Sequence, residues 1–192
     1  MVNRLLLFFL IGILSGCAQD KPEKYSAYKV HPITYQLQIL DSLNMAVLPE
    51  ENLKVKKTVT YNGQEEVVEL TDVNWNKELS FLSDFKPEKI FKANALDSTS
   101  QNLTTGVERR EYVVTDTSYF NIRKFAVELK DDKIKHISAE IKDENILYHT
   151  KKVIELDFDP ESRMLKQYFY FEQKNMALRG LNEYSIKASI IE

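Results

Sequence analysis

The second half of the chain alternates between apolar and polar residues with a period of two, which is the pattern of half-buried β-strands. Short polar turns such as Asp131-Asp132 and Asp159-Pro160 separate the alternating runs. We expect about six strands here, since each run has an ordinary strand length. They are 107–115, 122–130, 133–142, 146–158, 164–172 and 184–190. Short connections predict an antiparallel meander over 106–190, with one face on a core and one in water.

The alternation also predicts which side chains of these strands point inward. On the strand 164–172 it places Leu165, Phe169 and Phe171 on the core face, with Tyr168 and Tyr170 on the other face. On the remaining strands the expected inward residues are Phe125, Val127, Leu129, Ile137, Ala139, Ile141, Ile154, Leu156, Phe158, Tyr184, Ile186, Ala188 and Ile190.

A β-hairpin is predicted over 54–70, before the meander. Asn62-Gly63 is a preferred type I′ dipeptide, because both central residues of that turn need a positive φ. Folding about it places Lys56 opposite Glu69, so a basic strand faces an acidic one. This pairing favours a structural role for the lysines over an anion-binding site.

Two helices are expected from apolar residues at helical spacing, one on each side of the hairpin. His31-Pro32 can begin a helix over 33–45, because Pro is tolerated at the first helical position. Thr71-Asp72 can cap a second helix over 72–85, and Pro87 would prevent its continuation. We expect 97–102 to be a loop. The expected fold class is therefore α+β, with both helices packed on the sheet.

The amino terminus carries a short apolar run from Leu5 to Leu14 after Arg4, followed by Ser15-Gly16-Cys17 and a polar stretch. The run is about half the roughly 20 residues that a spanning helix needs. This resembles a bacterial lipoprotein signal peptide with its lipobox. The resemblance implies cleavage before Cys17 and acyl chains on that residue, which would anchor the chain stably in a membrane.

The domains expected from this are a signal peptide (1–16), a lipidated tether (17–31) and a single α+β domain (32–192). Ala18 follows the expected lipidation site instead of the aspartate that retains enteric lipoproteins at the inner membrane, which favours the outer membrane. The segment VNWNKELSFLSDF (73–85) is similar to a group of small lipoproteins from Bacteroidota-type bacteria, and that similarity implies no activity.

Composition excludes several classes of function. The formal net charge is −3 with both signs interspersed, so no basic patch indicates nucleic-acid binding. Cys17 is the single cysteine, which leaves no disulfide framework. No nucleophile elbow or phosphate loop is present, and we expect no enzyme, cofactor or metal. His136 and His149 flank one turn and could be cross-strand neighbours, yet two histidines make an incomplete ligand set.

Aromatic residues are the remaining candidates for a binding site. The sequence predicts that they fill the core, and the alternative is an apolar trough for a lipid or other amphiphile. The candidate trough residues are Trp75, Phe158, Phe169, Phe171 and Tyr184. The sequence therefore favours a membrane-anchored, non-enzymatic interaction or assembly module at the cell envelope, with an envelope protein or lipid as partner. A carrier of a hydrophobic small molecule is the alternative.

Overall fold

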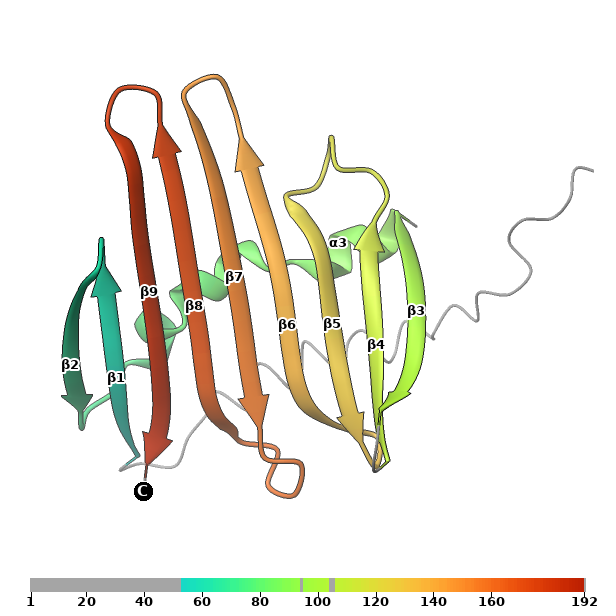
Figure 1. Ribbon diagram of the computed structural model, residues 1–192. Helices are drawn as coiled ribbons and strands as arrows, with labels where there is room; N and C mark the ends of the chain where they lie inside the picture. The colour runs from blue at the N-terminus through green and yellow to red at the C-terminus, as the bar shows by residue number, and fades with distance from the viewer. Residues whose placement is uncertain (1–52, 94, 104–105, 192) are drawn as a thin grey trace, which may run out of the picture. The chain divides into compact units, whose positions relative to one another are not determined.

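The computed structural model describes residues 53–93, 95–103 and 106–191 (Figure 1). All of them belong to one of two units of the chain, His31–Glu192. The signal peptide, Cys17, the tether and the expected helix over 33–45 lie outside the described residues.

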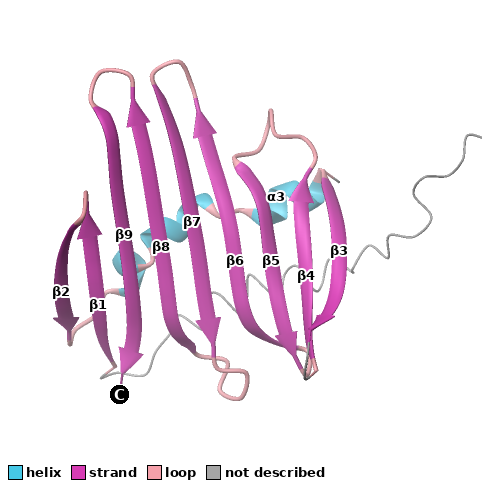
Figure 2. Cartoon of the chain, in the orientation of Figure 1, coloured by secondary structure: helices cyan, strands magenta, loops and turns pink. Residues whose placement is uncertain are grey.

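The described residues form a single antiparallel sheet of nine strands, in the order β2-β1-β9-β8-β7-β6-β5-β4-β3 (Figures 1 and 2). The strands are β1 (Lys54–Tyr61), β2 (Gln64–Leu70), β3 (Leu96–Leu103), β4 (Val107–Val114), β5 (Ile122–Lys130), β6 (Lys133–Glu144), β7 (Tyr148–Phe158), β8 (Leu165–Met176) and β9 (Gly180–Ile191). From β3 to β9 each strand pairs with the next, as an antiparallel meander requires.

The hairpin β1–β2 joins the sheet through pairing of β1 with β9, from Lys54↔Ile191 to Tyr61↔Tyr184. This pairing places β2 and β3 at opposite edges. The chain between them must therefore cross the sheet, whose nine strands at about 4.8 Å spacing span about 38 Å. It does so through α2 (Trp75–Glu78), the 3₁₀ helix η1 (Ser80–Asp84) and α3 (Pro87–Lys92), which pass behind the strands in Figure 1.

The core lies between this crossing segment and one face of the sheet, which we call the covered face. Leu79, Phe85 and Ile90 from the crossing segment are buried in the same cluster as apolar side chains of the strands. The least exposed side chains on the strands are Val55, Val127, Ile137, Ile154, Leu156 and Tyr168. No described helix lies on the opposite face, which we call the open face.

The expected α+β class is wrong, since the described fold is a large antiparallel sheet with very little helix. The six expected strands are present, and β1, β2 and β3 extend the same sheet to nine. The segment 97–102, expected as a loop, belongs to β3. Its small polar residues carry no apolar alternation, but each pairs with β4, from Leu96↔Val114 to Leu103↔Val107.

The expected helix over 72–85 is also wrong. Asn74 is the residue that caps α2, its side chain accepting a hydrogen bond from the backbone N–H of Lys77 at 3.2 Å. Leu79 leaves helical geometry at φ −100° and ψ 20°, so the segment breaks into short turns. Pro87 begins α3, where its missing N–H costs nothing. Within the described residues, no helix has the length and apolar character needed to cross a membrane.

The predicted hairpin over 54–70 is confirmed in its register. Lys56 pairs with Glu69 and Val55 with Leu70. Asn62 and Gly63 have φ of 47° and 83°, the positive values that a type I′ turn demands.

The predicted facing of β8 is wrong, and a β-bulge is the cause. Phe158 pairs with Leu165 whereas Asp157 pairs with Gln167, so Lys166 is one extra residue on β8. An extra residue exchanges the two faces of the strand beyond it. Tyr168 and Tyr170 are therefore buried on the covered face, while Phe169 and Phe171 are half-buried on the open face.

Candidate functional site

The five candidate trough residues do not come together. Trp75 and Tyr184 pack at the margin of the core, and Phe158 is buried within it. Phe169 and Phe171 belong to the open face because of the bulge on β8. These five residues therefore do not line a common trough under the crossing segment.

Aromatic rings fill the space that such a trough would need. Phe81 of η1 stacks on Tyr170 with ring centroids 4.9 Å apart, and lies 5.7 Å from the ring of Tyr168. Tyr184 meets Tyr170 edge-on at 6.1 Å. Further along the sheet, Tyr112 stacks on Phe125 at 4.7 Å. These contacts describe a packed aromatic core, in which Tyr168 and Tyr170 occupy the places that the sequence assigned to Phe169 and Phe171.

A charged group is set into this aromatic layer. Glu78 of α2 accepts hydrogen bonds from Lys57 Nζ on both carboxylate oxygens, at 2.8 and 2.9 Å, and from the Tyr168 hydroxyl. The side chains of Lys57 and Glu78 are only 16% and 10% exposed. The contact joins α2 to β1 and β8, so it holds the crossing segment on the sheet. Residue pattern gave no signal for it, because the three residues are far apart in sequence.

The buried phenols resist ionisation. Burial, followed by the neighbouring Glu78 carboxylate, raises the pKa of Tyr168 well above its usual value. Burial and the Glu172 carboxylate, whose Oε2 accepts a 2.6 Å hydrogen bond from the Tyr170 hydroxyl, raise the pKa of Tyr170 in the same way. Burial is also the main cause of the raised pKa of Tyr112 and Tyr184. Tyr168 and Tyr170 act as hydrogen-bond donors to carboxylates.

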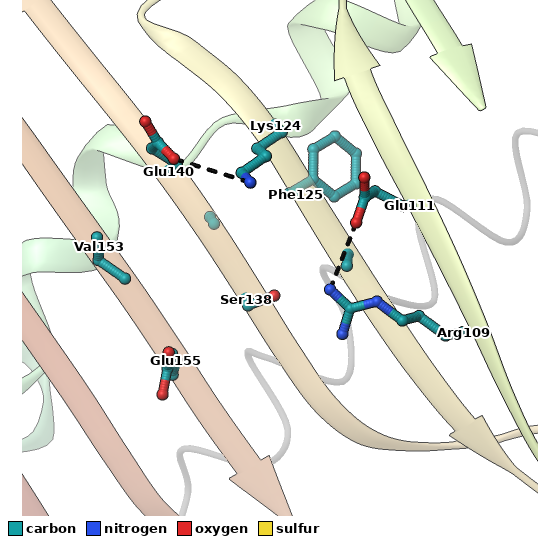
Figure 3. Close-up of a pocket in the computed structure, with 10 residues that line it drawn as sticks. Arg109, Glu111, Lys124, Phe125, Ser138, Glu140, Val153 and Glu155 are labelled. Atoms are coloured by element: carbon teal, nitrogen blue, oxygen red, sulfur yellow. Dashed lines mark hydrogen bonds and ion pairs between the residues drawn. The ribbon is translucent and has the colours of Figure 1, made fainter. Parts of the chain in front are cut away.

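The open face carries a surface pocket of about 220 Å³ across β4, β5, β6 and β7 (Figure 3). At its floor the small residues Ala126 and Ser138 are cross-strand partners on β5 and β6. Ala126 is only 2% exposed, although it points away from the core. The pocket forms because these two short side chains lie between longer side chains of β4 and β7. The sequence pattern did not indicate this pocket.

Charged side chains surround this pocket. Arg109 contacts two carboxylates, Glu128 at 2.9 Å and Glu111 at 3.4 Å. Lys124 lies 4.0 Å from Glu140, and Figure 3 marks this ion pair with a dashed line. Glu155 and Val153 of β7 form the remaining side. Paired charges around a floor of small side chains suit recognition of a polar or charged group by hydrogen bonds and ion pairs.

The two histidines are not cross-strand neighbours, contrary to the sequence-based expectation. His136 pairs with Asp157, whereas His149 pairs with Glu144 at the other end of the same two strands. His136 Nδ1 lies 2.7 Å from Asp157 Oδ1 on the open face. Among the described residues, no group of three or more His, Cys, Asp or Glu side chains is arranged to hold a metal ion.

Removing one partner of the Glu78–Lys57 contact should destabilise the fold, because the other charge would stay buried and unpaired. We expect Glu78→Leu to lower the free energy of unfolding by about 3 kcal/mol, and the double variant Glu78→Leu, Lys57→Met to recover only part of that loss, because the Tyr168 hydroxyl still lacks its acceptor. Urea denaturation measures both effects. The exposed control Lys77→Met should change stability by less than about 0.5 kcal/mol. A double variant as unstable as the sum of its singles would contradict this role.

The raised tyrosine pKa values predict alkaline sensitivity. Below pH 10, Tyr168 is protonated in both the folded and unfolded states. Above pH 10 only the unfolded state loses the proton, so stability falls by up to about 1.4 kcal/mol per pH unit for each such group. Urea denaturation at pH 9, 10 and 11 should show this loss, and Tyr168→Phe should make it shallower. Equal slopes in the two proteins would show that Tyr168 is not the source.

Comparison with known proteins adds no family to this description. No protein-family model matches the chain, and no curated protein or solved structure is similar enough to match it. The function proposed below therefore rests on the residues and on their geometry.

Proposed function

We propose that this chain is an exported lipoprotein, anchored in the outer membrane through acyl chains on Cys17, whose domain is a non-enzymatic interaction or assembly module. The anchor is supported by the resemblance of Leu14-Ser15-Gly16-Cys17 to a lipobox. The module is supported by the open face of the sheet, and above all by its pocket with paired charges at Arg109 and Lys124.

The open face has the size and the chemistry of a protein-binding surface. Strands of about ten residues across a width of about 38 Å give roughly 1,000 Å², which exceeds the about 800 Å² per partner of a standard interface. Phe169 and Phe171 are half-buried on this face and lie beside Glu155 and Val153 in the pairing of β8 with β7. Apolar anchors among polar groups are typical of interface centres.

A second candidate function is a carrier of a hydrophobic small molecule or lipid. Phe169 and Phe171 could hold part of an amphiphile on the open face, as a carrier of hydrophobic molecules would require. Native mass spectrometry of protein with Cys17→Ser would detect a co-purifying lipid of defined mass. Such a lipid, lost in Phe169→Ser, would favour the carrier over the interaction module.

The anchor predicts the behaviour of Cys17→Ser. Without the thiol no acyl chain can be attached, so we expect no incorporation of labelled palmitate and accumulation of uncleaved precursor. Metabolic labelling followed by fractionation of inner and outer membranes measures both. Ser15→Ala, which keeps a small residue before the cysteine, is the matched control and should remain labelled. Labelled Cys17→Ser protein would end this part of the proposal.

The interaction module predicts a partner within reach of the pocket. A photo-crosslinking amino acid at Glu155, in the lipidated protein in cells, should give a discrete cross-linked product. The same amino acid at exposed Lys77, on the crossing segment, should not. Ser138→Trp should fill the pocket and abolish the product from position 155, while leaving the fold intact by circular dichroism. The same products from both positions, or none from position 155, would contradict the proposal.

A further inference from the structure

Three turns at one end of the sheet each present a large apolar side chain to solvent. In the antiparallel meander the turns β4–β5, β6–β7 and β8–β9 lie at the same end (Figure 1). Tyr119 is 82% exposed, Ile146 98% and Leu178 97%. Among the described residues no large apolar side chain is more exposed than these three. Leu147 of the β6–β7 turn is 69% exposed, and Leu181 at the start of β9 is 55% exposed. We call these five residues the apolar end.

The turns that carry these residues are held in place by their own hydrogen bonds. The backbone N–H of Ala177 in the β8–β9 turn donates to the carbonyl of Leu147 in the β6–β7 turn at 3.0 Å, so the two turns are tied together. Asn145 Oδ1 accepts from the N–H of Leu147 at 2.8 Å and of Tyr148 at 3.0 Å. Ile146 and Leu178 are therefore exposed on turns that are held by these hydrogen bonds.

The opposite end of the sheet carries charged turns. Asp131 and Asp132 of the β5–β6 turn lie between Lys130 and Lys133, and the β7–β8 turn contains Asp159, Glu161 and Arg163 (Figure 1). Asp159 accepts hydrogen bonds from the N–H of Glu161 and of Ser162 at 2.7 and 3.0 Å, and it forms an ion pair with Lys166 at 2.5 Å. One end of the strands is thus apolar at its tips, and these turns at the other end carry charges of both signs.

We propose that the apolar end enters the interfacial region of a lipid bilayer, with the strands directed away from it. The apolar side chains stand on separate projecting turns, which suits a soft, continuous apolar phase better than a shaped protein surface. Arg179, one residue beyond Leu178, and Lys174 are positioned to meet lipid phosphates. The charged turns at the far end stay in water in this orientation.

This contact is separate from the anchor on Cys17, because it uses side chains of the folded domain. Glu144 and Asp116 lie in or beside the same turns and offset the basic residues, so apolar burial supplies most of the attraction. We therefore expect binding to phosphatidylcholine as well as to anionic lipid, with a weak dependence on salt.

The lone native cysteine makes a local test simple. In the full chain with Cys17→Ser, a nitroxide is attached at Leu178→Cys, or at Glu161→Cys in the charged β7–β8 turn at the opposite end as the matched control. Vesicles of phosphatidylcholine with phosphatidylglycerol are added, and collision rates with oxygen and with a water-soluble nickel chelate are measured by electron paramagnetic resonance. We expect the label at position 178 to become several-fold less accessible to nickel and more accessible to oxygen, and the label at position 161 to stay in water.

Three results would overturn the proposal. One is a label at position 178 that stays in water with vesicles present. Another is equal immersion of both labels, which would mean nonspecific adsorption. The third is spin–spin broadening at position 178 that grows with protein concentration in the absence of lipid, which would assign the apolar end to a second copy of the chain. Ile146→Ser should reduce immersion of the label at position 178, with near-ultraviolet circular dichroism confirming the fold; unchanged immersion would also overturn it.

Discussion

The pairing of β1 with β9 is the constraint on which the rest of the structure depends. Val55 sits in this pairing opposite Ile190 and is fully buried. Because the first hairpin joins the last strand, the two edges of the sheet are formed by β2 and β3. The chain between them has to cross the whole sheet, and this crossing supplies the second layer of the core. A long-range contact thereby decides which face is covered.

The covered face is unusual in being rich in phenols and charge. Tyr168 and Tyr170 are buried there, and carboxylates of Glu78 and Glu172 accept their hydroxyl protons in hydrogen bonds. A buried hydroxyl without an acceptor costs free energy, so each of these rings requires a specific polar partner. The short turns α2 and η1 place Glu78 and Phe81 over the rings, which a continuous helix over the same residues would not achieve in the same register.

Much of the sheet could be predicted from local sequence, because apolar–polar alternation and turn residues are local properties. The Asn62-Gly63 hairpin and its register are an example. What local pattern could not show depends on distant partners. β3 has no alternation and is a strand because β4 pairs with it. The Lys57–Glu78 contact and the hollow over Ala126 and Ser138 arise only when separate strands meet. The continuous helix expected over 72–85 is absent because its apolar spacing fits a helix, whereas Asn74 caps only a short helix and Leu79 leaves helical geometry.

The extra residue Lys166 on β8 decides which aromatic rings of that strand enter the core. If Lys166 were paired as a regular strand residue after Leu165, Phe169 and Phe171 would take the covered face and Glu78 would lose its hydroxyl donor. Deleting Lys166 would instead leave Leu165, Gln167 and Tyr168 in regular alternation, with both tyrosines still inside. The bulge is therefore a place where the chain can shorten by one residue without exchanging the two faces of the strand.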